Sequence, residues 1–220
     1  MKLLSVNVAH PRSASWGNKE KPELTGIDKH PTSEAVGVTA PGPKGTGKTG
    51  IAGDRVYDKE HHGGDDQAVY AYAREDYDYW ERELGRELRG GMFGENLTVE
   101  GLNVTGALIG ERWRVGADVV LEVSCPRIPC GTFRGWMDEK GWLKTFTAAG
   151  KPGAYLRVIA PGEIRAGDSV SIESRPDHDV TIALTFRAAR VDKSLLPRLL
   201  AADALPEEIK QAARKAAEGS

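Results

Sequence analysis

The segment around the two cysteines combines residue types that could do chemistry. Residues 124–133 read SCPRIPCGTF and follow an apolar stretch that we expect to be a strand. Arg127 lies three residues before Cys130, so its cation would favour the Cys130 thiolate. A proline-stiffened thiolate beside an arginine suits a nucleophile or a ligand to a soft metal. Small buried filler is the alternative for a lone cysteine, and the residues leave both interpretations open. The cysteine spacing differs from CxxC, which argues against a closed zinc site.

A second polar segment, residues 61–67, reads HHGGDDQ. Two histidines and two carboxylates could bind a divalent metal, but His61 and His62 are adjacent and would point apart on an extended chain. The carboxylates after the glycine pair are equally explained as turn residues. We favour a third interpretation, in which Gly63 and Gly64 let backbone amides approach an anionic ligand.

Two further segments carry polar side chains beside expected strands. In Gly94–Thr98, Glu95 and Asn96 can hydrogen-bond a heterocycle through donors and acceptors, although an ordinary turn is the alternative. Arg157 alternates with apolar neighbours, so its side chain faces opposite to theirs and could pair with a phosphate. A surface arginine on a half-exposed strand is the alternative for Arg157.

Residues 42–49, GPKGTGKT, match the P-loop pattern letter for letter. That motif needs a preceding strand and a following helix, whose N-terminus holds the phosphates. Here the chain continues as GIAGDR, which is no helix start, and no βαβ alternation surrounds it. We therefore predict a surface loop. A nucleotide hydrolase that depends on Lys48 is the minor alternative.

These segments need a scaffold of many short strands, because 26 glycines and 12 prolines punctuate the chain. Alternating or β-rich runs predict strands over residues 3–8, 36–39, 67–72, 110–116, 119–123, 155–159 and 169–172. One internal helix is predicted over residues 74–88, where Tyr77, Trp80, Leu84 and Leu88 form an apolar stripe.

The composition changes after residue 175, where turns become rare. Three helices are predicted there, from the N-cap Asp179, after Asp192, and from Pro206. The chain thus divides into a β domain, residues 1–175, and a three-helix extension, residues 176–220. The extension is too small to be stable alone, so it should pack on the main domain or on a second subunit, as in a homodimer.

Composition narrows the class of protein. The chain has 220 residues, 40% of them apolar and 28% charged, which fits an ordinary soluble globular protein. A net charge of −2 argues against bulk nucleic-acid binding. No apolar run could span a bilayer, and the apolar stretch near Met1 is too short for a signal peptide. Two cysteines exclude a disulfide-built scaffold, so we expect a cytoplasmic protein with reduced thiols.

Together the segments resemble the MOSC family, named for the C-terminal domain of molybdenum-cofactor sulfurase. The resemblance covers roughly residues 1–175. The motifs that carry it, in the family's order, are Gly53-Asp54, His62-Gly63-Gly64-x-x-x-Ala68-Val69, Gly94-Glu95-Asn96-Leu97-Thr98, Ile109-Gly110-Glu111, Pro126-Arg127-x-Pro129-Cys130, Gly153-Ala154-Tyr155-x-Arg157-Val158 and Gly167-Asp168. The three-helix tail resembles the bacterial stand-alone branch, which includes proteins that protect cells from N-hydroxylated purine bases.

The resemblance implies a mainly β, barrel-like antiparallel domain with inserted helices, which binds a molybdenum–molybdopterin cofactor. The family's metal-ligating cysteine falls on Cys130, and Cys125 receives no role. The residues that the resemblance assigns to cofactor binding are His62, Gly63, Gly64, Glu95, Asn96, Arg127 and Arg157. Among them Arg127, Arg157 and the glycine amides would hold the pterin phosphate, and Asn96 with Glu95 would contact the pterin or orient the loop. This sequence departs from the family at Gln67, where relatives commonly have lysine, and in the loop 41–50.

The activity that the resemblance implies is the removal of oxygen from N-hydroxylated substrates such as hydroxylamino-purines, amidoximes and hydroxylamines. Nothing in the chain binds flavin or nicotinamide, so the electrons would come from a separate flavin or iron–sulfur reductase. The alternative is a non-catalytic module that carries the molybdenum cofactor or its sulfur.

Overall fold

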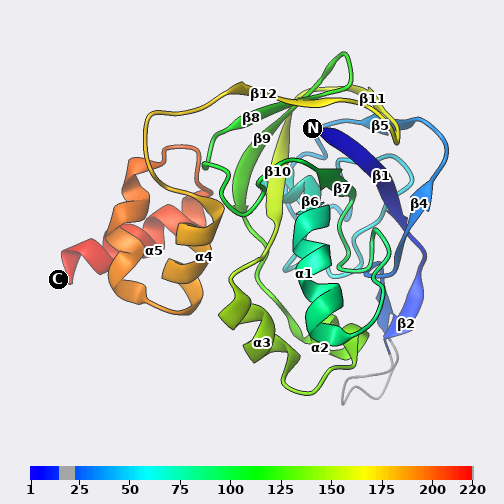
Figure 1. Ribbon diagram of the computed structural model, residues 1–220. Helices are drawn as coiled ribbons and strands as arrows, with labels where there is room; N and C mark the ends of the chain where they lie inside the picture. Colours follow the sequence, from blue (N-terminus) through cyan, green and yellow to red (C-terminus); the bar gives the residue numbers. More distant parts are fainter. Residues whose placement is uncertain (15–22, 220) are drawn as a thin grey trace.

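The computed structural model describes residues 1–14 and 23–219. Its centre is an eight-stranded sheet with the strand order β12-β8-β9-β10-β6-β7-β1-β4 (Figure 1). The strands of this sheet are β1 (Lys2–Ala9), β4 (Lys29–Thr32), β6 (Val69–Ala73), β7 (Leu97–Glu100), β8 (Arg112–Val115), β9 (Val119–Pro126), β10 (Ala154–Ala160) and β12 (Val170–Ser174). Two small sheets pair β2 (Arg12–Ala14) with β3 (Glu23–Thr25), and β5 (Val36–Val38) with β11 (Gly162–Ile164).

The large sheet is antiparallel except between β6 and β7, which run parallel. It curls so that its two sides approach: Leu3 donates its backbone N–H to Asp168 O at 2.9 Å, and Gly167 donates to Leu3 O at 2.8 Å. These bonds join the start of β1 to the turn before β12, but the described strands form no closed barrel. The predicted mainly β architecture with inserted helices is confirmed, with one parallel pair added.

Each predicted strand coincides with an observed one, but the predicted helix was too long. Helix α1 (Arg74–Leu84) ends because Gly85 adopts a left-handed conformation with φ 65°. Leu88 lies beyond the helix and is nevertheless buried, and its backbone N–H donates to Glu81 Oε1 at 2.7 Å. The chain folds back after Gly85, so the apolar stripe extends into a loop.

Two short helices that the sequence did not predict, α2 (Gly131–Met137) and α3 (Trp142–Ala149), lie beside α1 in Figure 1. Buried rings from these helices, β6 and the loop before β7 form an aromatic cluster that comprises Tyr70, Tyr72, Tyr77, Trp80, Phe93, Phe133, Trp142 and Phe146. This cluster is separate from the aliphatic core of the sheet. All five residues of β6 are buried because the strand is covered on both faces.

The C-terminal segment forms α4 (Ile182–Arg190), the 3₁₀ helix η2 (Lys193–Ala201) and α5 (Glu207–Glu218). Asp179 is not the N-cap of α4. Thr181 caps it, with its Oγ1 accepting from Leu184 N at 3.0 Å. A bond from Ile109 N to Val180 O at 3.0 Å keeps the preceding backbone extended, and Asp179 pairs with Arg198 instead. Asp192 and Pro206 precede η2 and α5 as predicted.

These C-terminal elements form a group on one side of the sheet, coloured orange and red in Figure 1. Their apolar side chains, among them Val180, Ile182, Leu199 and Leu205, belong to the same hydrophobic cluster as the strands. The segment therefore packs on the main domain, and the division at residue 175 stays a prediction. Within the described ranges, no helix has the length and apolar character needed to cross a membrane.

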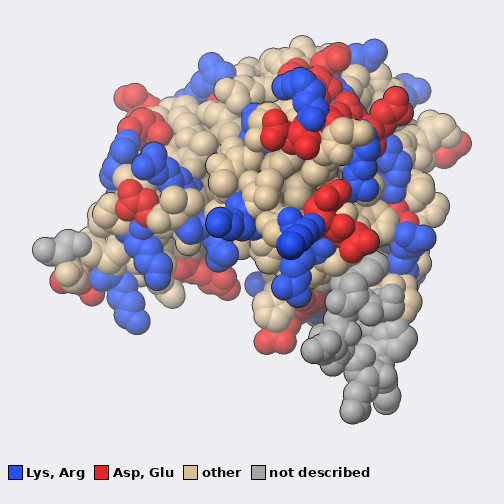
Figure 2. All heavy atoms as spheres, turned by 60° about the horizontal axis from the view of Figure 1, so that its bottom comes forward, with Lys and Arg blue, Asp and Glu red and all other residues tan. Residues whose placement is uncertain are grey.

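The surface is mixed in charge on the face that Figure 2 shows, where basic and acidic side chains are interspersed.

The glycine-rich residues 42–49 form a loop that no helix follows, so the arrangement that a P-loop needs is missing here. This loop instead forms hydrogen bonds with nearby segments of the chain. Gly42 N donates to Asp65 Oδ1 at 2.9 Å, and Val56 N donates to Gly47 O at 3.3 Å.

Candidate active site

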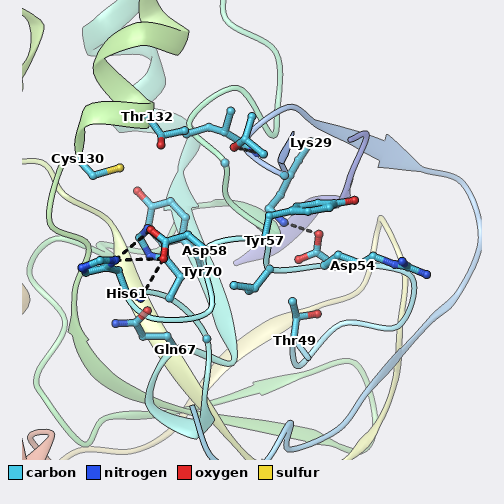
Figure 3. A pocket seen from close by; sticks show the side chains of 18 of the residues that line it. Lys29, Thr49, Asp54, Tyr57, Asp58, His61, Gln67, Tyr70, Cys130 and Thr132 are labelled. Carbon is cyan, nitrogen blue, oxygen red and sulfur yellow. Dashed lines mark hydrogen bonds and ion pairs between the residues drawn. The ribbon is translucent and has the colours of Figure 1, made fainter. Parts of the chain in front are cut away.

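A cavity of about 750 Å³ brings together segments that are distant in sequence. Figure 3 shows Cys130 and Thr132 at the upper left of the view, Gln67 and Tyr70 below them, and Lys29, Asp54 and Thr49 on the right. Of the predicted site residues, the cavity is lined by His62, Gly63, Asn96, Arg127 and Cys130. Gly64, Glu95 and Arg157 lie outside its lining.

Cys130 stands between the loop that leaves β9 and the first turn of α2, with its sulfur directed to the cavity (Figure 3). Burial raises the pKa of the thiol. A hydrogen bond with His62, the Arg127 cation and the Phe133 backbone N–H outweigh burial and lower the pKa from 9.0 to about 6. Cys130 is therefore mostly a thiolate at neutral pH, the form that attacks electrophiles and binds metals.

Alkylation of Cys130 in the cofactor-free protein should follow this pKa. The iodoacetamide rate should rise with a midpoint near pH 6 and level off by about pH 7, because the thiolate is the reactive form. Cys125 provides an internal reference, since burial raises its pKa to about 12 and it should stay unmodified. Peptide mass spectrometry after timed labelling distinguishes the two thiols, and a midpoint above about pH 8 would contradict the assignment.

Arg127 is buried beside Cys130, with 5% of its surface exposed. Its guanidinium lies 3.7 Å from the centroid of the Phe133 ring. Its Nη1 atom is buried and has no hydrogen-bond partner within the described part of the chain. A buried cation without a counter-charge is costly, and the aromatic face offsets only part of that cost. Arg127 is therefore a residue of the cavity lining that could pair with an anionic group near Cys130.

Opposite Cys130, Asp54 organises the cavity wall. It accepts hydrogen bonds from Ala9 N at 3.0 Å, Lys29 Nζ at 2.5 Å and Asn96 Nδ2 at 2.8 Å. Asn96 Oδ1 in turn accepts from Tyr70 N at 3.1 Å. The predicted residue Asn96 thus faces the cavity, but its amide is already bonded to protein. Lys29 was missed because it belongs to no recognisable motif.

The two adjacent histidines diverge, as expected for neighbours in the chain. His61 is exposed and contacts Asp58 at 3.1 Å, whereas His62 lines the cavity and helps to lower the pKa of the Cys130 thiol. Across the described ranges, no three His, Cys, Asp or Glu side chains converge to hold a metal ion. Gly63 faces the cavity, but a Cβ on Gly64 would meet Lys44 N at 2.9 Å. Gly64 therefore permits the close approach of the loop 41–50, and its place at the ligand stays a prediction.

Glu95 points into the protein and is not part of the cavity lining. It is fully buried and accepts from Gly91 N at 2.6 Å, Tyr77 OH at 2.8 Å, Thr98 Oγ1 at 2.8 Å and Phe93 N at 3.2 Å. Burial raises the pKa of Glu95, although these hydrogen bonds oppose the rise. Of the two predicted roles, contact with the pterin and orientation of the loop, the geometry fits the second.

Arg157 likewise lies behind the cavity. Its Nε pairs with Asp66 Oδ1 at 2.6 Å, and its Nη1 donates to Ala204 O at 2.6 Å and Glu122 Oε1 at 3.3 Å. The arginine thereby ties the 3₁₀ turn η1 (Asp65–Gln67) to β10 and to the C-terminal segment. All of these contacts are internal, and the phosphate contact of Arg157 stays a prediction.

Gln67 and Tyr155 also line the cavity, although the sequence motifs gave neither residue a role in ligand binding. Gln67 has a buried Oε1 without a hydrogen-bond partner inside the described ranges. Tyr155 is half-buried at the cavity, and its hydroxyl makes no hydrogen bond to any described residue. No spacing or periodicity distinguishes these side chains, because their role arises only from the tertiary arrangement.

Comparison with known proteins agrees with these motifs. The family model of the MOSC domain matches residues 58–171. The uncharacterized protein YflK of Bacillus subtilis (strain 168) is 32% identical over 208 residues, covering 93% of this chain and 89% of that protein. The protein YiiM of Escherichia coli (strain K12) is 35% identical over 136 residues, which cover 60% of each chain. A protein named reductase from Gibberella moniliformis is 32% identical over 161 residues, which cover 70% of this chain and 28% of that protein.

Solved structures show the same fold. YiiM from Geobacillus stearothermophilus superimposes with a TM-score of 0.74 at 25% identity, covering 98% of both chains. YiiM from Escherichia coli gives a TM-score of 0.71 at 24% identity, covering 100% of this chain and 94% of that one. The family model, the relatives and the motifs agree, and the chain belongs to the MOSC domain family.

Proposed function

We propose that this protein is a molybdenum-cofactor-dependent oxidoreductase that removes oxygen from N-hydroxylated substrates. The substrates would be hydroxylamino-purines, amidoximes or hydroxylamines, and a separate flavin or iron–sulfur reductase would supply electrons. The observation that carries the proposal is the meeting of the Cys130 thiolate with the unpaired Arg127 Nη1 at one cavity. That pair fits a cofactor which is anionic and binds through sulfur.

Several residues of the cavity would bind different parts of this cofactor. Cys130 Sγ would be the protein ligand to molybdenum, and His62 would orient that sulfur. Arg127 would pair with the anionic part of the cofactor, with Gly63 offering backbone close to the ligand. When bound, the cofactor supplies two-electron redox chemistry that no side chain can perform. The net reaction converts R–NHOH, two electrons and two protons into R–NH₂ and water.

The comparisons support the reductive direction. The relative from Gibberella moniliformis is named reductase. The shared segment covers 28% of that protein's length. We place the reaction in the cytoplasm because both cysteines are free thiols, which that compartment maintains. A homodimer formed through the C-terminal helices stays a prediction.

The test is an anaerobic turnover assay with protein loaded with molybdenum cofactor. A reduced viologen dye replaces the unidentified reductase, and the substrates are a hydroxylamino-purine, an amidoxime and hydroxylamine. We expect the amine product to accumulate, and cofactor-free protein provides the control. Stoichiometric pterin binding with no reduction of any substrate would contradict the proposal and favour a cofactor carrier.

A further inference from the structure

Two tyrosines stand side by side on the cavity wall but differ in what their hydroxyls do. Tyr70 on β6 and Tyr155 on β10 are direct cross-strand partners, with ring centroids 5.2 Å apart. The Tyr70 hydroxyl donates to Pro152 O at 2.8 Å and is therefore occupied. The Tyr155 hydroxyl has no such partner among the described residues, although it belongs to the cavity lining.

Tyr155 also lies within electrostatic range of the groups assigned to the cofactor. Burial raises the pKa of its phenol to about 12, the Arg127 cation opposes that rise, and the charges of Cys125 and Cys130 add to it. The phenol therefore keeps its proton throughout the physiological range and can act only as a neutral hydrogen-bond donor or acceptor. A polar group of this kind, on an aromatic wall beside the reacting centre, is typical of residues that orient a ligand.

We propose that Tyr155 is a catalytic residue whose hydroxyl donates a hydrogen bond to the oxygen of the substrate N–O group. This inference rests on the proposed function. In the net reaction the N–O bond would break with the consumption of two electrons, supplied by the flavin or iron–sulfur reductase, and two protons from solvent. The oxygen leaves as water and the amine remains. Because negative charge develops on that oxygen as the bond breaks, a donor already aimed at it stabilises the transition state.

The hydroxyl of Tyr155 would thus distinguish the N-hydroxylated substrate from its reduced product. Only the substrate carries the oxygen that the phenol contacts. The free tyrosine therefore favours binding of the substrate over the amine and contributes to product release. Tyr70 cannot take this role, since its hydroxyl is committed to Pro152.

The experiment compares Tyr155→Phe with Tyr70→Phe in protein loaded with molybdenum cofactor. Without a reductant no turnover occurs, so dissociation constants for a hydroxylamino-purine and its aminopurine can be measured at equilibrium by tryptophan fluorescence. We expect Tyr155→Phe to weaken binding of the hydroxylamino-purine by about three- to tenfold and leave aminopurine binding unchanged. Tyr70→Phe should leave the ratio of the two affinities as in the wild type.

Turnover with reduced viologen and molybdenum per chain complete the test. We expect the kcat of Tyr155→Phe to fall by roughly 100- to 1,000-fold, the size typical of losing one donor aimed at developing charge, with molybdenum unchanged. An unaltered affinity ratio in an active protein, or loss of molybdenum from Tyr155→Phe, would overturn the role of Tyr155 alone. A wild-type protein that reduces no substrate would instead overturn the proposed function. Tyr155→Leu, which should show the same selective loss, replaces the first variant if that one fails to fold.

Discussion

Arg127→Met is expected to weaken cofactor binding sharply while leaving the cofactor-free protein as stable as the wild type, or more stable. A hydrogen bond to a charged group contributes about 1.5–3 kcal/mol, so the affinity for the cofactor should fall by roughly 10- to 150-fold. The free energy of unfolding should not fall, because Arg127 Nη1 is buried without a partner and methionine removes that cost. The loss of the cation–π contact with Phe133 lowers the free energy of unfolding by about 0.5–2 kcal/mol, and this partly offsets the stability gained by removing the unpaired cation.

Urea unfolding of the cofactor-free variants and cofactor retention on a desalting column measure the two effects separately. Arg134→Met is the matched control, since Arg134 is exposed on α2 only seven residues away. Arg134→Met should change neither the free energy of unfolding nor the retention of the cofactor. An Arg127→Met protein that keeps the cofactor with wild-type affinity would show that the anion site lies elsewhere.

Cys130→Ala should abolish reduction of N-hydroxylated substrates, by about a thousandfold or more, while the fold stays intact. Losses of that size follow when the group that organises a reaction centre is removed. Little stability should be lost, because Cys130 is only partly buried at the edge of the aromatic cluster and alanine removes a single sulfur atom. The measurements are viologen-driven turnover and the melting temperature.

Cys125→Ala is the control for this variant. Cys125 lies on β9 with 5% exposure, and its sulfur is not part of the cavity lining. Its loss should lower stability by about 1 kcal/mol through a small cavity and leave turnover within about twofold of the wild type. Equal loss of turnover in both cysteine variants would contradict the assignment of Cys130.

The strands could be predicted because alternation and β-branched residues report burial on one face, a property local to each segment. The short helices α2 and α3 could not. They have seven and eight residues, too few to show a helical stripe, and they are fixed by burial of Phe133, Trp142 and Phe146 in the aromatic cluster. The end of α1 was missed because the left-handed turn at Gly85 stops the helix before its apolar pattern stops.

The site was predictable where neighbouring residues in the chain act together. Arg127 and Cys130 are three residues apart, and the structure keeps them together at the cavity. The sequence could not show that Glu95 and Arg157, whose polarity suggested a ligand, have hydrogen-bond partners in other parts of the protein. Arg157 reaches Asp66, 91 positions away, and Ala204, 47 positions away. Sequence pattern alone cannot show whether a buried charge is satisfied internally.

Molybdenum content per chain shows whether Cys130 anchors a molybdenum cofactor in this cavity. The wild type, Cys130→Ala and Cys125→Ala would be produced in a host that makes the cofactor and analysed by elemental mass spectrometry. We expect near-stoichiometric molybdenum in the wild type and Cys125→Ala, and almost none in Cys130→Ala. Equal molybdenum in all three proteins, or none in a wild type made where a known molybdenum enzyme is loaded, would contradict it.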